Sequence, residues 1–381
     1  MMSPRLSVAD VPTPAAVLDL DIVERNVAAM AAKARALGVA LRPHAKTHKC
    51  VEVALLQRDH GARGLTVATL PEGRAFADAG CDDLTWAVPV VPGRIGEAVQ
   101  LARRITLRLL VESDAAAGLL ERAAREAGIR LHVWLEVDCG QHRTGVDPAA
   151  PHARALARRL AASRHLAFDG ILTHAGHSYS ALDREDLGRI ADEERDATVA
   201  FRRALEADGL AVPGVSIGST PTMAVATALE GVTEIRPGNY VFNDFVQAAN
   251  GVCGAEDCAL TVLASVISHQ PGADHAVVDA GALALSKDLG PSAPARQRGY
   301  GPLLVGMAGR EVEPRLRVRS LTQEHGVVAG PDAADVDGRL AVGEKVRILA
   351  NHSCLAAALF DEYYVVRGEE VVDRWRIRRA R

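Results

Sequence analysis

The stretch from residue 105 to residue 137 decides the fold. It opens with the apolar run Ile105-Thr-Leu-Arg-Leu-Leu-Val111, continues through the alanine-rich segment 113–127, and closes with a second apolar run, Leu131-His-Val-Trp-Leu-Glu-Val137. Such runs are typical of parallel strands buried on both faces, and the amphipathic segment between them is typical of a covering helix. The stretch therefore predicts a strand–helix–strand unit of an α/β fold.

The same alternation extends along most of the chain. Strands are predicted at residues 40–42, 65–70, 83–88, 106–111, 131–138, 168–174, 214–218 and 234–236. Amphipathic helical segments separate most of them, for example at residues 92–103, 149–163 and 184–208. About eight such units form a (β/α)8 TIM-type barrel, which is the fold that we expect.

The pattern changes after Tyr240. Short β-rich segments separated by Gly, Pro and Asp turns replace the alternation, at residues 259–267, 276–278, 315–321, 345–349, 363–366 and 370–374. These segments predict a second, mostly antiparallel β domain that begins near residue 248.

Composition argues against several classes of partner. The chain has 381 residues, of which 48% are hydrophobic and 24% charged, and its formal net charge is -4 at pH 7. The basic block at 374–379 lies at the end of the chain, so we expect no nucleic-acid partner. We find no signal-peptide pattern and no apolar run long enough to cross a membrane. Six scattered cysteines without a CxxC pair indicate reduced thiols in a cytoplasmic protein.

Barrel active sites are built at the ends of the strands, and the first predicted strand is followed by Arg42-Pro-His-Ala-Lys-Thr-His-Lys49. Lys46 is placed there to act as a nucleophile and to form a Schiff base, because burial lowers the pKa of an ammonium group. The alternative is a solvated basic loop, and the segment alone favours neither. Lys49, one helical turn further on, is interpreted as structural or exposed.

Two later strand ends carry side chains suited to an aromatic cofactor. Arg143 could contact a ring oxygen or an acidic substrate, although a loop ion pair with a nearby aspartate is the alternative. A flat His174 can stack on a ring, and Tyr179 offers a phenol to a ring nitrogen or a substrate. A lone histidine is more often a satisfied core residue, but His174, His177 and Tyr179 around one glycine favour a site.

The segment Gly218-Ser219-Thr220 follows a predicted strand and precedes a predicted helix. Backbone N–H groups, hydroxyls and the helix dipole favour a phosphate there, and the late loops of a barrel are its usual place. The alternative is a simple helix N-cap. The next unit, Arg236-Pro237-Gly238-Asn239-Tyr240, supplies further N–H and hydroxyl donors, and Gly238, Asn239 and Tyr240 are its predicted cofactor-binding residues.

In the β domain, His352 and Cys354 stand one residue apart. On a strand or turn, this spacing directs an imidazole and a thiolate to one side, as a zinc-type pair requires. A site with only two protein ligands keeps open positions for water or substrate, which is the catalytic kind. By spacing alone, a buried cysteine beside an unrelated histidine is the favoured interpretation.

Together these motifs resemble the D-serine dehydratase / D-threonine aldolase family, which are fold-type III pyridoxal-phosphate (PLP) enzymes with an alanine-racemase-like barrel. The resemblance runs essentially end to end. It rests on four motifs in the same order: Arg42–Lys49 as the cofactor-lysine segment, Gly218-Ser219-Thr220 as the phosphate loop, and Gln323–Gly326 with His352–Cys354 as the metal region. Segments 172–176, 215–222 and 231–236 are most similar to the branch that acts on D-threo-3-hydroxyaspartate.

The resemblance implies roles for individual residues. Lys46 would carry the PLP cofactor as a Schiff base, with His174 and Tyr179 near it. His352 and Cys354 would hold a divalent metal (Zn, Mn, Mg or Co) beside the substrate hydroxyl. The family is also expected to form homodimers.

The resemblance also implies the domain boundaries. In that fold, the opening strand at residues 15–20 joins the C-terminal β domain. We therefore expect residues 22–247 to form the PLP-binding barrel. Residues 1–21 and 248–381 would form the β domain that carries the metal pair.

The function expected from these motifs is a PLP- and metal-dependent lyase. It would dehydrate a D-β-hydroxy amino acid such as D-3-hydroxyaspartate or D-serine to a keto acid and ammonia, with Lys46 removing the Cα proton. The alternative is a retro-aldol cleavage, with His177 or a metal-bound water as the base. The His-x-Cys pair resembles the dehydratases, whereas some aldolases have His-x-Asp there. An amino-acid racemase or a non-catalytic PLP carrier would leave that pair without a purpose.

Overall fold

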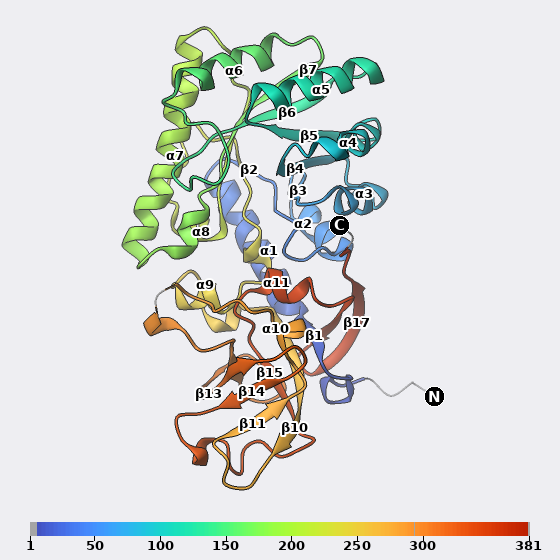
Figure 1. Cartoon of the computed structure of the whole chain (residues 1–381), viewed down its shortest axis with the longest axis vertical. Helices are drawn as coiled ribbons and strands as arrows, with labels where there is room; N and C mark the ends of the chain where they lie inside the picture. The colour runs from blue at the N-terminus through green and yellow to red at the C-terminus, as the bar shows by residue number, and fades with distance from the viewer. Residues whose placement is uncertain (1–5, 293, 380–381) are drawn as a thin grey trace. The chain divides into compact units, whose positions relative to one another are not determined.

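The computed structural model describes residues 6–292 and 294–379. The described chain divides into two compact units (Figure 1). The barrel unit consists of residues 29–46 and 51–238, and the β unit consists of residues 6–28, 47–50 and 239–379. The boundaries expected at residues 22 and 247 stay a prediction.

Eight parallel strands form the sheet of the barrel unit in the described residues. They are β2 (Ala40–Leu41), β3 (Leu65–Val67), β4 (Asp83–Pro89), β5 (Thr106–Val111), β6 (Leu131–Glu136), β7 (Leu166–Leu172), β8 (Val215–Ile217) and β9 (Glu234–Ile235). Their order in the sheet is β2-β9-β8-β7-β6-β5-β4-β3. His44, just after β2, pairs in parallel with Thr66 of β3, so the two edge strands meet and the curled sheet closes. The predicted barrel fold is confirmed.

Helices alternate with these strands, and Figure 1 shows α4 to α7 along the outer side of the sheet. The helices are α1 (Leu20–Ala36), α2 (Val51–Asp59), α3 (Leu70–Asp78), α4 (Ile95–Ala102), α5 (Asp114–Ala127), α6 (Pro151–Ala162), α7 (Arg184–Ala207) and α8 (Thr220–Val225). Local signals set their ends: Ser113 caps the N-terminus of α5, and Gly128 ends it with a φ of 65°.

One predicted strand was too long. The strand expected at residues 65–70 ends at Val67, because Thr69 and Glu72 form a capping box that starts α3 at Leu70. The hydroxyl of Thr69 accepts the N–H of Glu72, and the Glu72 carboxylate accepts the N–H of Thr69. The helix therefore begins at Leu70, a residue that the apolar pattern alone assigned to the strand.

Charged side chains form a connected layer beside the apolar core of the barrel unit. Arg42 is 1% exposed, and its guanidinium pairs with Glu234 at 2.9 Å and with Asp83 at 2.5 Å. Arg108 pairs with the same Asp83 and, at 2.6 Å, with Asp169. Because a buried charge is costly without a partner, this network holds the start of β4 to β2, β5 and β9.

The β unit is built on a nine-stranded sheet in the part of the chain that the structure describes. Its strands are β1 (Ala15–Asp19), β10 (Leu260–His269), β11 (His275–Val278), β12 (Pro302–Leu304), β13 (Val312–Leu321), β14 (Gly326–Ala329), β15 (Lys345–Ile348), β16 (Glu362–Arg367) and β17 (Glu370–Arg376). The order is β11-β14-β13-β12-β15-β10-β1-β16-β17, and a further β10–β11 pairing closes the larger part on itself. The predicted, mostly antiparallel β domain is confirmed.

The opening strand β1 lies inside this sheet. It pairs antiparallel with β10 and parallel with β16. In the described residues of the unit, three short α-helices accompany the sheet: α9 (Phe245–Ala249), α10 (Ala282–Leu285) and α11 (Ser353–Ala357). The start of α11 is the place of the predicted metal pair.

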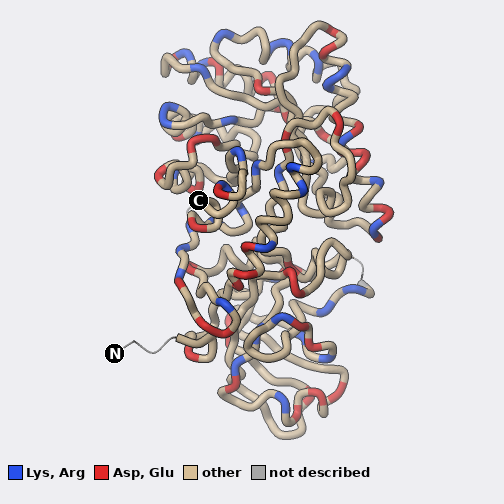
Figure 2. Tube along the Cα trace, turned by 180° about the vertical axis from the view of Figure 1, so that it is seen from behind, with Lys and Arg blue, Asp and Glu red and all other residues tan. Residues whose placement is uncertain are grey.

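Figure 2 shows Lys and Arg interspersed with Asp and Glu over both units. Within the described ranges, no helix is both long enough and apolar enough to cross a membrane.

Candidate active site

A cavity of about 290 Å³ lies in the barrel unit. Its polar walls come from the segments that follow the strands: His44 and Lys46 after β2, Glu136 and Arg143 at and after β6, His174 after β7, and Arg236 after β9. Gly218, after β8, and apolar side chains of β4, β5 and β7 complete the lining. The structure thus brings together four predicted site residues: Lys46, Arg143, His174 and Gly218.

The cavity is rich in positive charge. Lys46, Arg143 and Arg236 all line it. Desolvation, followed by the charges of Lys46 and Arg236, holds the pKa of His174 well below its ordinary value. The His174 imidazole is therefore neutral at pH 7, while the cations favour an anionic ligand.

Glu136 at the end of β6 is a carboxylate that the sequence analysis did not identify as part of the site. Its Oε1 accepts a hydrogen bond from the Thr144 hydroxyl at 2.8 Å, whereas the buried Oε2 has no partner among the described residues. Burial raises the pKa of Glu136, although Thr144 and Arg143 oppose that shift. A ligand that donates an N–H or O–H would satisfy the Oε2 atom.

Arg236 is the second cavity residue that the sequence analysis did not select, although it opens the predicted donor segment Arg236–Tyr240. Its Nη1 donates to the Ser216 hydroxyl at 2.5 Å and its Nη2 to the Thr173 carbonyl, so the guanidinium is fixed against β7 and β8. Burial lowers the pKa of Arg236, against the raising effect of Glu234 and other carboxylates. The signal was available, because Arg236 ends the eighth strand in the same way that other site residues end theirs.

The Gly218-Ser219-Thr220 segment has the hydrogen bonds of a helix cap. Ser219 is the N-cap of α8, and it forms a capping box with Thr222. Gly218 has a φ of +104°, a backbone conformation that side chains rarely adopt. Ser219 and Thr220 are both buried. The N-cap interpretation left open by the sequence is thus realised, and the phosphate role stays a prediction.

His177 and Tyr179 lie in a 3-10 helix at Gly176–Ser180 and do not line the described cavity. His177 is next to Gly140, where an added Cβ would be 3.8 Å from its Cε1 atom. Its Nδ1 is buried and has no partner within the described residues. His177 is therefore not among the residues that line the described cavity, and its role as a base stays a prediction.

The predicted metal pair lies in the β unit, at the start of α11. His352 is the N-cap residue and Cys354 is in the first turn, so the pair is on a helix end and not on a strand. His352 Nδ1 is 3.1 Å from Asp288 Oδ2, and Cys354 Sγ is 3.2 Å from Thr47 Oγ1. Burial lowers the pKa of His352, but Cys354 and Asp288 outweigh it and raise the value to about 11.

Asn239, predicted to bind the cofactor, lies beside this pair in the β unit. Its Nδ2 donates to Asp244 at 2.7 Å and to the Ser353 hydroxyl at 3.0 Å, and it is 3.5 Å from Cys354 Sγ. Tyr240 and Gly238, named with it, are buried. The Asp244 carboxylate also accepts the N–H of Ser353, which fixes the start of α11.

In the described residues, no three His, Cys, Asp or Glu side chains cluster closely enough to hold a metal ion. His352 and Cys354 would therefore share an ion with water or with a ligand. The Gln323–Gly326 segment is the turn between β13 and β14, where Gln323, Glu324 and His325 are exposed.

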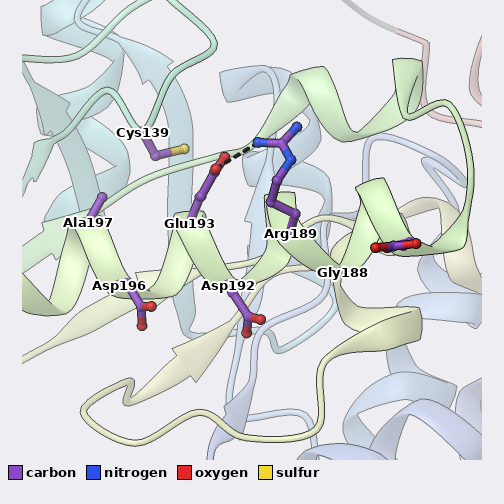
Figure 3. Close-up of a pocket in the computed structure, with 8 residues that line it drawn as sticks. Cys139, Gly188, Arg189, Asp192, Glu193, Asp196 and Ala197 are labelled. Atoms are coloured by element: carbon purple, nitrogen blue, oxygen red, sulfur yellow. Dashed lines mark hydrogen bonds and ion pairs between the residues drawn. The ribbon is translucent and has the colours of Figure 1, made fainter.

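A shallow hollow on α7 has different chemistry. Figure 3 shows the Arg189–Glu193 ion pair across it, with Cys139 opposite the helix. Burial and the nearby Glu194 raise the pKa of Cys139 to about 12, so the thiol is protonated. The acids of the hollow are exposed, and we find no catalytic role for it.

Comparison with known proteins agrees with the motifs. The model for the alanine racemase N-terminal domain matches residues 18–244, and that for a putative serine dehydratase domain matches residues 259–366. D-threo-3-hydroxyaspartate dehydratase from Delftia sp. strain HT23 is 44% identical over 95% of this chain and 96% of its own length. D-threonine aldolase from Arthrobacter sp. is 32% identical over 97% of this chain and 93% of its own length.

Solved structures agree. The metal-free form of a cysteine-to-alanine mutant of D-threo-3-hydroxyaspartate dehydratase superposes with a TM-score of 0.93 at 42% identity, over 98% of this chain and 99% of that one. The fold and the sequence therefore match the same group of enzymes. The chain belongs to the alanine-racemase-like family of D-serine dehydratases and D-threonine aldolases, whose named members are lyases of D-hydroxy amino acids.

Proposed function

We propose that the protein is a PLP-dependent, metal-assisted lyase that dehydrates a D-β-hydroxy amino acid to a keto acid and ammonia. D-threo-3-hydroxyaspartate is the first candidate substrate and D-serine the second. The observation that carries the proposal is the cationic cavity that contains Lys46, in a chain similar over 95% of its length to a named dehydratase.

The cavity residues fit the cofactor. Lys46 supplies an amine for covalent attachment, in a cavity whose positive charge suits an anionic cofactor. Gly218 has no side chain, and its φ of +104° would strain any other residue, so this part of the cavity wall is left open. The Oε2 atom of Glu136, which has no partner among the described residues, offers a hydrogen-bond acceptor. When bound, PLP supplies an electron sink for the electrons of the broken Cα–H bond.

The protein's own side chains then have separate tasks. Lys46 removes the Cα proton as the general base. Arg143 binds a substrate carboxylate, and a neutral His174 adds no further positive charge to the cavity. A dicarboxylate such as 3-hydroxyaspartate gains from the second arginine, Arg236, which is why it is placed before serine.

We propose that His352 and Cys354 hold a divalent metal. The closeness of the two side chains supports this, because a neutral imidazole and a thiolate side by side can bind a cation once both have lost their protons. A related dehydratase was solved as a metal-free cysteine mutant, which supports the same ligand type. When bound, the metal supplies a Lewis acid for a hydroxyl leaving group. Full keto-acid release after the metal is stripped would contradict this role.

Retro-aldol cleavage is the second candidate, and the similarity to D-threonine aldolase favours it. It needs a base at the β-hydroxyl. His177, the protein side chain expected to supply it, is absent from the described cavity walls. We therefore place dehydration first.

One product assay separates the candidates. Purified enzyme is incubated with D-serine, D-threonine and both diastereomers of D-3-hydroxyaspartate. We expect keto acid and ammonia, with the highest rate on the threo diastereomer. Glycine and an aldehyde would identify an aldolase instead, and no product from any of the four would overturn the proposed function.

We propose in addition a cytoplasmic homodimer. The family resemblance supports the dimer, and the six free thiols support a reducing compartment. Light scattering on the purified protein would give twice the mass of one chain, whereas a monomer would contradict the proposal.

A further inference from the structure

Glu194 is a buried glutamate on α7 that no step of the proposed reaction uses. Its exposed fraction is 0%. A single oxygen, Oε1, accepts the backbone N–H of Ala175 and the backbone N–H of Gly218, each at 3.0 Å. Burying a carboxylate is costly unless it is hydrogen-bonded, so these two contacts have to be kept together.

The two N–H groups belong to different active-site loops. Ala175 follows His174 after β7, and Gly218 follows β8. Both His174 and Gly218 line the cavity that contains Lys46. The Glu194 carboxylate therefore links the two loops that form these cavity walls. It contacts their backbone N–H groups and does not itself line the cavity.

Other contacts support the same junction. The hydroxyls of Ser178 and Ser219, one from each loop, are 2.9 Å apart. The φ of Gly218, at +104°, shows that its loop adopts a conformation that few residues hold unaided.

The charge of Glu194 also has a partner in the cavity. Burial raises the pKa of Glu194, while the two N–H groups and the positive charge of Arg236 oppose that shift. Arg236 is held by Thr173, directly after β7, and by Ser216 of β8, the strands from which the two loops start. The length of the Glu194 side chain thus sets its hydrogen bonds to the two loops, and its negative charge faces Arg236. A variant can change either property without the other.

We propose that Glu194 is a positioning residue that locks the loop after β7 to the loop after β8, and that this junction sets the affinity of the cavity for a phosphate-bearing pyridoxal cofactor. The inference rests on the proposed function, since it needs that cofactor in this cavity. Gly218 begins the segment expected to hold the phosphate, so the effect is expected to depend on the phosphate.

The test is cofactor affinity. Apoenzyme is titrated with PLP and, separately, with pyridoxal, which lacks the phosphate, and the absorbance of the lysine-bound cofactor gives each dissociation constant. Glu194→Ala removes an acceptor of two hydrogen bonds. We expect it to raise the dissociation constant for PLP by about tenfold or more, and that for pyridoxal by less.

Two conservative variants keep the test valid if the alanine variant does not fold. Glu194→Gln keeps the length and the acceptor but not the charge, so it is expected to bind PLP nearly as the wild type does. Glu194→Asp keeps the charge but withdraws the acceptor by one methylene, so it is expected to lose affinity. The opposite order, with Asp retained and Gln lost, would overturn the junction.

A stability control excludes a general effect of damage to α7. Leu205 is buried near the C-terminal end of the same helix, and Leu205→Ala is expected to lower the melting temperature without changing the PLP dissociation constant. An equal loss of affinity in Leu205→Ala, or wild-type affinity in Glu194→Ala, would overturn the inference. A wild-type protein that binds no PLP would overturn the proposed function instead, so the two failures are distinct.

Discussion

Oδ2 of Asp288 lies 3.1 Å from Nδ1 of His352, and the other carboxylate oxygen accepts the N–H of Gly290 at 2.8 Å. The carboxylate thus fixes both the ring orientation of His352 and the loop behind it. A histidine that binds a metal commonly has such a partner, which directs its other nitrogen toward the ion.

We predict that Asp288→Asn weakens metal binding by about 10- to 100-fold, because the ring loses its charged partner. Calorimetric titration of the metal-free protein with Zn²⁺ or Mn²⁺ measures the change. Asp274→Asn is the matched control, since Asp274 contacts the exposed His275 at 2.8 Å in the same unit. Equal affinity in the Asp288 variant and the wild type would show that the contact has no part in metal binding.

Replacing Lys46 tests the assignment of the cofactor lysine. Lys46→Ala is expected to abolish both the visible absorbance of lysine-bound PLP and the turnover, because no amine remains in the cavity wall for attachment. Lys49→Ala, three residues away, is expected to retain both. If the Lys49 variant lost the absorbance and the Lys46 variant kept it, the assignment would be reversed.

Much of the barrel and part of its site followed from the sequence. Parallel strands end at the same edge of a barrel, so side chains that follow different strands converge whatever their separation along the chain. This rule brought Lys46, Arg143, His174 and Gly218 into one predicted site. The same rule covers Arg236, which the sequence analysis placed first in the donor segment Arg236–Tyr240 but did not select as a site residue.

Glu194 could not be found in that way. It lies inside a 24-residue helix, next to Glu193, which is exposed. Glu194 shares the helical spacing of the buried Ile190 and Phe201, so it falls on the buried face of the helix. The period gives the face but not the contacts, because the packing of α7 on the loops after β7 and β8 decides which backbone N–H groups the carboxylate accepts. His352 and Cys354 show a different limit, because α11 has five residues, too few for a helical period to appear in the sequence.

The neutral His174 predicts a pH dependence of stability. Its pKa in the folded protein is lowered, first by desolvation and then by Lys46 and Arg236, whereas an unfolded histidine titrates near pH 6.5. Below that pH the unfolded chain therefore binds a proton at His174 that the folded protein does not bind. The free energy of unfolding falls as the pH falls. For one proton that binds only the unfolded chain, the free energy of unfolding falls by about 1.4 kcal/mol for each pH unit.

Urea unfolding of cofactor-free protein at pH 7.5, 6.5 and 5.5 measures this effect. The wild type is expected to lose more stability between pH 6.5 and 5.5 than His174→Gln, by about 1 kcal/mol. The comparison with the variant removes the contribution of the other histidines. Identical slopes would mean that His174 takes up its proton in the folded state.

The layer of ion pairs around Arg42 gives the largest expected effect on stability. Arg42→Met removes the charged partner from Glu234, which is 4% exposed, and one of two arginines from Asp83. Breaking a buried pair from one side leaves a charge uncompensated, so the free energy of unfolding is expected to fall by about 3–5 kcal/mol. Arg104→Met breaks an exposed pair with Asp78 at 2.6 Å and is expected to cost less than about 1 kcal/mol.

Urea unfolding of both variants shows whether the contribution of these ion pairs to stability depends on their burial. Equal losses would show that the Arg42 pairs are solvated in solution. A large loss for Arg42 alone has a further consequence at the site, because Glu234 also accepts from the Ser216 hydroxyl at 2.7 Å, and Ser216 in turn holds Arg236. The Arg42 variant is therefore expected to weaken binding of a dicarboxylate substrate even where it remains folded, whereas Arg104→Met leaves that binding unchanged.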